Sequence, residues 1–241
     1  MERIGANLGT IAATAHLLVL PALGIDSLDG VVALALEGDD RPVRFGAEAS
    51  AVLTTGADRC ALSRTSPAAA AAVPSAYGYS LGPIAAGAAE DLAPGTGATM
   101  INWWRLGVSA EAIGIMQKAL DIAVRYAKDR RTFGRAIGSF QALQHRTAEL
   151  TVLLEGARWL TYEAAFHGAP GEASATAAAH TMAIVHTLTR ETHQILGAIG
   201  LTREHDLHLY TLRLQVLGAE LGGLRHHRRA LVAARWGGGG S

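Results

Sequence analysis

The sequence contains only one cysteine, Cys60, and this scarcity excludes two kinds of feature. One thiol cannot form a disulfide within the chain, and it cannot build a cysteine-rich metal centre. Such cysteine usage is typical of a reducing cytoplasm, which is the compartment we expect. Long apolar runs are also missing, because no stretch approaches the ~20 residues of a membrane-spanning helix. The short apolar run at 17–20 ends at Pro21 and has no basic segment before it, so it does not resemble a secretory signal.

Neither sign of charge is in excess. The chain has 21 basic and 21 acidic side chains, which give a formal net charge of zero at pH 7. We therefore expect no broad electrostatic attraction to nucleic acid or to an anionic membrane. The basic run Arg225–Arg229 is interpreted as the solvated end of a terminal helix, where basic side chains interact favourably with the helix dipole.

The motifs of several enzyme classes are missing as well. The sequence has no G-x-S-x-G, no H-E-x-x-H and no P-loop. Its ten histidines are not arranged as metal ligands. His180 and His186 are six residues apart and do not share a helical face, while the neighbours His226 and His227 point about 100° apart on a helix. We therefore expect no metal site.

Short strands are predicted in the first hundred residues. The apolar run 31–36 is followed by a turn signal and is typical of a buried strand. The runs 52–55 and 59–63 are predicted to form a hairpin across the turn at 56–58. An apolar stripe at helical spacing predicts a helix over 2–20. This half of the chain is expected to form a partial sheet beside one helix.

Four long amphipathic helices are predicted beyond residue 100, at 101–129, 140–167, 172–196 and 206–236. Their short connections favour an up-and-down bundle. The fourth helix is apolar around much of its circumference, so we expect a large oligomeric interface, above ~2,000 Å² in total. The tail at 237–241 consists of glycine and serine and is predicted to be a flexible linker.

One connection between helices carries groups that suit a dinucleotide. Arg131 follows a predicted helix and offers a planar cation with several donors to a pyrophosphate. Phe133 offers an aromatic face to a purine, and Gly134 permits a sharp turn. Taken alone, the segment also fits an ordinary connection with surface arginines, and that alternative stays open.

Two segments resemble signatures of the acyl-CoA dehydrogenase family. The first runs from Tyr126 to Gln141 and contains Tyr-x-x-x-Arg, Arg-x-Phe-Gly and Phe-Gln. The second runs from Gln194 to Glu204 and is similar to Gln-x-x-Gly-Gly-x-Gly-x-x-x-Glu, with Ala198 in place of the second glycine. The resemblance covers residues 100–235 well and residues 31–65 weakly.

The resemblance implies a mainly α fold with a C-terminal four-helix bundle. It divides the chain into an N-terminal helical remnant at 1–24, a reduced middle β-domain at 25–98, the bundle at 99–236 and the flexible tail at 237–241. It also implies that FAD is shared across a subunit interface. Its ADP half is expected to contact six residues of this chain, which are Arg131, Thr132, Phe133, Gln194, Gly197 and Gly200.

The same resemblance leaves the catalytic base in question. In this family a glutamate removes the α-proton of the acyl-CoA while hydride passes to the flavin. Counting from Gln194 without gaps places Leu221 at the position of that glutamate, and Glu220 lies one residue away. On a continuous helix Glu220 would point about 100° off. The other position used by relatives, on the first bundle helix, holds Trp104, while its neighbour Arg105 is expected near bound CoA.

Three functions therefore remain open from the sequence. The favoured one is a non-catalytic or half-site subunit, whose full-length partner supplies the base, the flavin-ring contacts and the acyl pocket. The segment His205–Tyr210 is similar to the corresponding segment of a family branch, the bacterial heteromeric enzymes that act on steroid side-chain CoA thioesters. The second is an autonomous homo-oligomeric dehydrogenase that uses Glu220 as its base. The third is a flavin-free structural or binding protein that kept the fold. The isolated chain is expected to be inactive.

Overall fold

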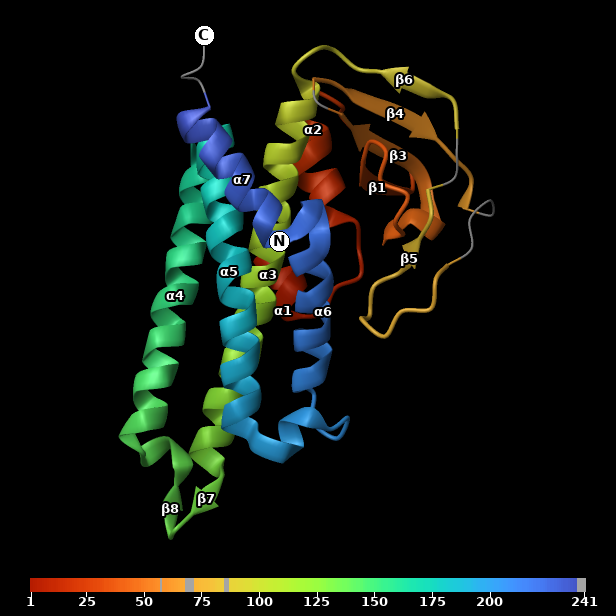
Figure 1. Ribbon diagram of the computed structural model, residues 1–241. Coiled ribbons are helices and arrows are strands. Elements are labelled where there is room, and N and C mark those ends of the chain that lie inside the picture. The colour runs from red at the N-terminus through yellow and green to blue at the C-terminus, as the bar shows by residue number, and fades with distance from the viewer. Residues whose placement is uncertain (57, 68–71, 85–86, 238–241) are drawn as a thin grey trace.

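A small sheet lies beside a bundle of long helices (Figure 1). The computed structural model describes residues 1–56, 58–67, 72–84 and 87–237. Most of them are helical, which confirms the mainly α fold class. Among the described residues, no helix has the length and apolar content needed to cross a membrane.

Four strands form the sheet in the order β1 (Val31–Leu36), β3 (Ala49–Thr55), β4 (Cys60–Arg64) and β6 (Ala89–Asp91). Strand β1 is parallel to β3, whereas the β3–β4 and β4–β6 pairs are antiparallel. The predicted hairpin is thus confirmed in both of its strands, and Ala57 of its turn lies outside the described residues. The short strands β2 (Val43–Arg44) and β5 (Leu81–Gly82) form a separate antiparallel pair.

Strand β1 is apolar on both faces because each face is covered. Alternate side chains of a strand point to opposite sides of the sheet. Val32 and Leu34 pack into the main core, and Ala33 and Ala35 pack against a second small core that includes Val52. A continuous apolar run is the pattern expected of a strand buried on both sides.

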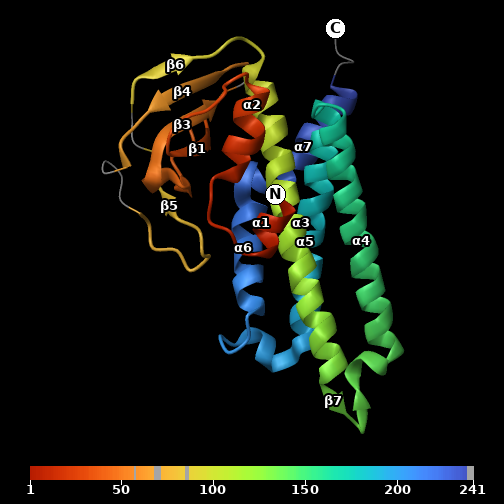
Figure 2. The same ribbon diagram turned by 180° about the vertical axis from the view of Figure 1, so that it is seen from behind.

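The bundle is built around α3 (Thr96–Asp129), which packs against α4 (Gln141–Phe166), α5 (Gly171–Leu196) and α6 (Leu207–Ala219). Helix α7 (Gly223–Trp236) packs mainly on α5. Figure 2 shows from behind that α4 lies at the outer edge of the bundle, on the side away from the sheet. The first three predicted bundle helices are confirmed, although α3 begins five residues earlier than expected.

The prediction of one continuous fourth helix is wrong. Helices α6 and α7 are separated by a 3₁₀ turn at Glu220–Gly222. Leu221, Gly222 and Gly223 have φ angles of 52°, 79° and 70°. These values lie in the left-handed region and cannot continue a right-handed helix. The basic run at 225–229 therefore lies in the first half of α7, where the helix dipole opposes cations instead of favouring them.

The predicted helix at 2–20 is also interrupted. Helix α1 (Glu2–Ala6) ends before Leu8, whose φ angle is 52°, and the chain turns helical again in a π-helix at Ala15–Val19 and in α2 (Leu20–Ala22). Helix α1 lies directly against α3. A Cβ atom built on Gly114 of α3 would lie only 2.0 Å from the carbonyl oxygen of Glu2. The absence of a side chain at Gly114 therefore permits this close packing.

We predict that Gly114→Ala destabilises the fold by about 1–3 kcal/mol, because the added methyl group forces α1 away from α3. The matched control is Gly218→Ala in α6, where a Cβ atom would meet no heavy atom within 4 Å. This control should be neutral or stabilising by up to about 1 kcal/mol through helix propensity. Urea unfolding measures both. Equal stability of the two variants would contradict the packing of α1 on α3.

Candidate functional site

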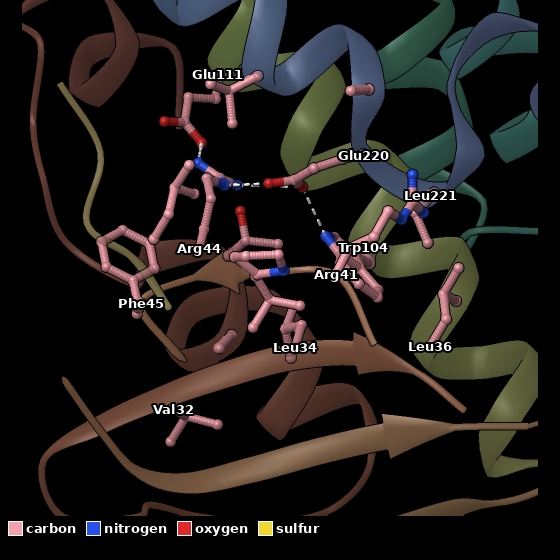
Figure 3. A pocket seen from close by; sticks show the side chains of 18 of the residues that line it. Val32, Leu34, Leu36, Arg41, Arg44, Phe45, Trp104, Glu111, Glu220 and Leu221 are labelled. Atoms are coloured by element: carbon pink, nitrogen blue, oxygen red, sulfur yellow. Dashed lines mark hydrogen bonds and ion pairs between the residues drawn. The ribbon is translucent and has the colours of Figure 1, made fainter. Parts of the chain in front are cut away.

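A cavity of about 320 Å³ lies between the sheet and the bundle (Figure 3). Its walls come from the segment at 11–15, from β1, from the segment at 39–45, from α3 and from the end of α6. Most of the lining is apolar, including Val32, Leu34, Leu36, Val43, Phe45, Leu81, Val216 and Leu221. A cavity of this size and character suits a small apolar group.

Charged side chains occupy one end of this cavity. Arg44 Nη1 donates a hydrogen bond to Glu111 Oε2 at 2.9 Å. Arg44 also binds both oxygens of Glu220: its Nε donates to Oε1, and its Nη2 donates to Oε2 at 3.3 Å. Trp104 Nε1 donates to the same Oε2 at 3.0 Å. The three charged side chains are almost buried, with exposed fractions of 9% for Arg44, 5% for Glu111 and 12% for Glu220.

Two further side chains extend the network away from the cavity. The Tyr79 hydroxyl donates to Glu111 Oε1 at 2.5 Å, and the guanidinium groups of Arg44 and Arg213 lie 4.8 and 4.5 Å from the centre of the Tyr79 ring. Arg213 donates to the carbonyl oxygens of Gly9 and Gly78, each at 2.8 Å. The two arginines balance the two glutamates, so the network carries no net charge.

Burial and pairing act in opposite directions on these groups. Burial raises the pKa of Glu220, and the nearby Glu111 adds to this effect, while Arg44 and Trp104 oppose it. Burial would lower the pKa of Arg44, but the two carboxylates hold it above its ordinary value. Arg44 therefore stays charged, and it holds both carboxylates at the end of the cavity.

The third carboxylate of the lining is paired as well. Asp39 accepts from Arg41 Nε at 2.7 Å and from Arg41 Nη2 at 2.6 Å, and these hydrogen bonds lower the pKa of Asp39. Every carboxylate that lines the cavity in the described residues is thus bound to an arginine. The arrangement can hold an apolar group, and among the described residues it presents no carboxylate that is free of an arginine partner.

The Glu220 side chain points in a different direction from the one expected on a continuous helix. On a continuous helix its side chain was expected to point away from the site. The break after Ala219 instead directs its carboxylate to the cavity, beside the buried Leu221 (Figure 3). Its role as a base remains a prediction.

Sequence reasoning missed Arg44 and Glu111. Arg44 is separated from Glu220 by 176 residues, and no local pattern connects them. Glu111 had a weak signal, because it lies seven residues after Trp104 and therefore on the same face of α3. An acidic residue on an otherwise apolar helical face is a candidate for a buried pair.

The expected CoA contact, Arg105, does not line this cavity. Its side chain is buried and lies near His226 and His227 of α7. Its Nη1 donates to Asn102 Oδ1 at 3.1 Å. Burial lowers the pKa of Arg105, and the positive charge of Arg105 helps to lower the pKa values of His226 and His227. For buried His227, burial is the larger cause, and its pKa falls to about 4. A CoA contact at Arg105 remains a prediction, on a different face of α3 from the cavity.

The residues expected to contact FAD lie at the other end of the bundle. Strands β7 (Arg131–Thr132) and β8 (Arg135–Ala136) form a hairpin beyond α3. At its tip, the Phe133 side chain is 91% exposed and its φ angle is 55°. Gln194 and Gly197 are exposed and Gly200 is buried where α5 ends, near the same end of the bundle (Figures 1 and 2). Along α3, Trp104 and Asp129 are about 38 Å apart.

These exposed groups fit the ADP half of a flavin dinucleotide. Arg131 and Thr132 are exposed on the hairpin, and within the described residues Arg131 forms no ion pair. An exposed guanidinium beside an exposed aromatic ring suits a pyrophosphate next to a purine. In the described part of the chain, no group of three or more His, Cys, Asp or Glu side chains is placed to hold a metal ion.

We predict that Arg44→Met destabilises the fold by about 3–5 kcal/mol, because Glu111 and Glu220 lose their shared cation while buried. The control is Arg41→Ala, which removes the arginine of an exposed pair from the same cavity lining. This control should cost about 1 kcal/mol or less. Denaturant unfolding of both variants at pH 7 measures the difference. A cost for Arg44→Met as small as that of Arg41→Ala would show that the network contributes little to stability.

Comparison with curated proteins finds relatives that align with about half of this chain. The acyl-CoA dehydrogenase IpdE2 of Mycolicibacterium smegmatis is 40% identical over 127 residues, which are 52% of this chain and 40% of that protein. IpdE2 of Mycobacterium tuberculosis is 40% identical over 129 residues, which are 54% of this chain and 40% of that protein. The match thus spans less than half the length of these relatives.

Solved structures share the fold over almost the whole chain. A variant of the Tcur3481–Tcur3483 steroid ACAD aligns with a TM-score of 0.79 at 22% identity, over 100% of this chain and 80% of that chain. The ChsE4–ChsE5 complex from Mycobacterium tuberculosis aligns with a TM-score of 0.73 at 21% identity, over 95% of this chain and 76% of that chain. At such identities the likeness concerns the fold alone.

A family comparison agrees with these alignments. The family model described as "Acyl-CoA dehydrogenase, C-terminal domain" matches residues 96–238. The match begins with α3 and takes in all five bundle helices, so it includes both segments on which the resemblance rests. Because it covers more than half of the sequence, this chain belongs to the acyl-CoA dehydrogenase family.

Proposed function

We propose that this chain is the non-catalytic or half-site subunit of a heteromeric, FAD-dependent acyl-CoA dehydrogenase. The observation that carries the proposal is the pairing of every cavity-lining carboxylate in the described residues with an arginine. Reactions of this family act on a CH–CH bond and begin with removal of an α-proton. A general base must be free and within hydrogen-bond reach of that proton.

Glu220 is poorly suited to this task because both of its oxygens are engaged. Oε1 accepts from Arg44, and Oε2 accepts from Arg44 and Trp104. Charge-assisted hydrogen bonds of this kind are stronger than neutral ones. Protonation of Glu220 would weaken them and leave the charge of Arg44 balanced by Glu111 alone. We therefore assign the base to the partner subunit.

The hairpin end of the bundle supplies the second part of the proposal. Arg131, Phe133 and Gln194 bind the ADP half of a flavin whose ring lies on the partner subunit. The flavin, when bound, supplies the hydride acceptor. Exposure of these groups far from the cavity of the same chain supports a site shared between chains. Thr132 and Gly197 complete the proposed contact surface, whereas Gly200 is buried and cannot contact the dinucleotide without a local rearrangement.

The substrate and assembly follow from the relatives and stay part of the proposal. We infer an acyl-CoA substrate, with a steroid side chain as the favoured acyl group, because one structural relative is described as a steroid ACAD. Two structural relatives carry paired protein names, and one of them is described as a complex. A heterotetramer with a full-length dehydrogenase subunit is the assembly that we propose.

One observation favours the alternative of an autonomous dehydrogenase. The Glu220 carboxylate lies at the cavity, and burial raises its pKa toward the range in which a carboxylate works well as a base. In this alternative, Arg44 would have to release Glu220 when substrate binds. A flavin-free binding protein is the third candidate, and an absorbance spectrum of the purified complex separates it from the other two.

The variant Glu220→Gln distinguishes the half-site subunit from the autonomous enzyme. In the co-purified complex, we expect activity to change by less than about threefold, because the partner supplies the base. An autonomous enzyme would lose about a hundredfold or more, since a general base typically contributes 10²–10⁴-fold. Flavin absorbance and thermal stability are measured on the same samples. A large loss of turnover with flavin and assembly intact would overturn the proposal.

The variant Arg131→Lys tests the flavin contact. Loss of the bidentate geometry should lower FAD affinity by roughly ten- to a hundredfold, which corresponds to about 1.5–3 kcal/mol. Arg125→Lys is the matched control, because Arg125 is an exposed arginine of α3 that precedes the signature segment. Flavin retention during dialysis of the complex measures both variants. Equal retention in the two variants would mean that Arg131 is an ordinary surface residue.

A further inference from the structure

Helix α7 has a basic outer face that acidic side chains do not balance. Residues 221–236 contain four arginines and no aspartate or glutamate. Because the whole chain has a formal charge of zero, this segment carries four positive charges and the rest of the chain carries four negative ones. Among the described residues, Arg225, Arg228 and Arg229 form no ion pair, while the fourth arginine, Arg235, lies 3.6 Å from a carboxylate of α5. The charge of this neutral chain is therefore unevenly distributed.

The arginines belong to one stripe that also contains apolar side chains. At 100° per residue, six residues of α7 fall within about 120° of the helix circumference, over a length of about 17 Å. The six are Arg225, Arg228, Arg229, Val232, Arg235 and Trp236. All of them are exposed, with exposed fractions of 53% for Val232 and 66% for Trp236. Buried His227 lies on the inner side of the helix, which packs on α5.

The backbone of α7 adds to the positive field of this stripe. Arg225, Arg228 and Arg229 lie in the first half of the helix, where the helix dipole places partial positive charge. The same three arginines and Val232 line an open groove along the helix. Burial lowers the pKa of the neighbouring His226, and the positive charges of two nearby arginines lower it further. Negative charge brought to this groove would relieve the repulsion among these cations.

An anionic lipid surface matches both parts of the stripe. Each basic side chain near such a surface strengthens binding about fivefold. The interfacial layer of a bilayer also accepts tryptophan and aliphatic side chains next to arginines, whose charged groups stay among the headgroups. A nucleic acid duplex matches the arginines, but it gives Val232 and Trp236 no apolar layer to enter. The mixture of charge and apolar side chains therefore favours lipid.

The hairpin at the other end of the bundle also carries three exposed arginines, but it is less suited to this role. An exposed carboxylate, Asp129, lies next to them. The guanidinium group of Arg135 lies 4.1 Å from the centre of the Phe140 ring, so this cation already has an aromatic partner within the chain. The hairpin therefore serves as the comparison surface in the experiments below.

We propose that the outer face of α7 docks on an anionic lipid surface. The three unpaired arginines contact headgroup phosphates, and Val232 and Trp236 enter the interfacial layer. Because the rest of the chain is acidic on balance, an anionic surface repels its other faces and selects this orientation. The hairpin and the end of α7 lie at opposite ends of the bundle, so docking leaves the hairpin open (Figures 1 and 2). The proposal does not rest on the half-site role.

Cosedimentation of the full chain with lipid vesicles tests the docking face. We expect binding to vesicles made of equal parts of phosphatidylcholine and phosphatidylglycerol, and no binding to phosphatidylcholine alone. The triple variant Arg225→Gln/Arg228→Gln/Arg229→Gln should lower the partition coefficient roughly a hundredfold, because three arginines contribute about fivefold each. Added salt should weaken the binding of the wild-type chain, since the attraction is electrostatic.

A second triple variant is the matched control. Arg130→Gln/Arg131→Gln/Arg135→Gln removes the same charge from the hairpin and should change the partition coefficient by less than about threefold, because these charges lie away from the docking face. Circular dichroism checks that both triple variants keep the fold. Equal losses in the two variants would show that net charge alone controls binding, and this result would overturn the proposal.

A matched pair of tryptophan variants tests the apolar contact. Trp236→Ser should weaken vesicle binding roughly tenfold, because the side chain no longer enters the interfacial layer. Trp159→Ser on α4 should leave binding unchanged, although the two side chains have nearly equal exposed fractions of 66% and 67%. An effect of Trp159→Ser as large as that of Trp236→Ser would place the docking face elsewhere on the chain.

The vesicle experiments use the full chain alone and the complex with its partner. Absence of binding to anionic vesicles in both samples would overturn the proposal. Release of the chain by inorganic pyrophosphate at constant ionic strength would indicate a site for a small anion. Binding of a DNA duplex that is lost in the α7 triple variant would indicate a nucleic-acid site, and either result would also overturn the proposal. None of these measurements depends on flavin content or turnover, so the proposed function keeps its own tests.

Discussion

The buried guanidinium of Arg44 joins the two halves of this protein. It lies on β2 and binds Glu111 of α3 and Glu220 at the end of α6, so one side chain connects the sheet region with two bundle helices. Removal of each of these ions from water costs several kcal/mol, and only their mutual hydrogen bonds offset that cost. The position of the β2 segment against the bundle is therefore coupled to the pairing of these three charges.

The break between α6 and α7 belongs to the same arrangement. Leu221 has a left-handed backbone, which costs roughly 1–2 kcal/mol for a residue with a side chain. In return, Leu221 is buried in the core, and Glu220 meets Arg44 and Trp104. The charged side chains at the end of the cavity are thus paired with one another within the chain. Within the described residues, each carboxylate that lines the cavity is therefore paired with an arginine of the same chain.

Two outer surfaces of the chain differ from the cavity because their side chains are left exposed. The hairpin exposes Arg131 and Phe133 beyond the end of α3, and α4 exposes an apolar stripe along the edge of the bundle. Among the described residues, Arg131 has no ion-pair partner, and the apolar side chains of the α4 stripe are not covered by other parts of the chain. The contrast between charges paired within the chain at the cavity and groups exposed at the outer surfaces agrees with the subunit role that we propose.

Local patterns in the sequence determined the strand at 31–36, the hairpin after it, three bundle helices and the family signatures. Each of these depends on residues that are neighbours in the chain, through periodicity, turn residues or a conformationally fixed motif. The paired glycines at 222 and 223 were the local sign of a helix break, but apolar periodicity on both sides outweighed it.

Only the tertiary structure decided the content of the cavity. Arg44 meets Glu111 across 67 residues and Glu220 across 176 residues, and neither partner is marked by its neighbours in sequence. Ion pairs between such distant residues form only when folding removes them from water together, because in the unfolded chain each is solvated and screened separately. The sequence therefore determined most of the elements and the family, whereas the helix break at 220–223 and the pairing of the Glu220 carboxylate were set by how those elements pack.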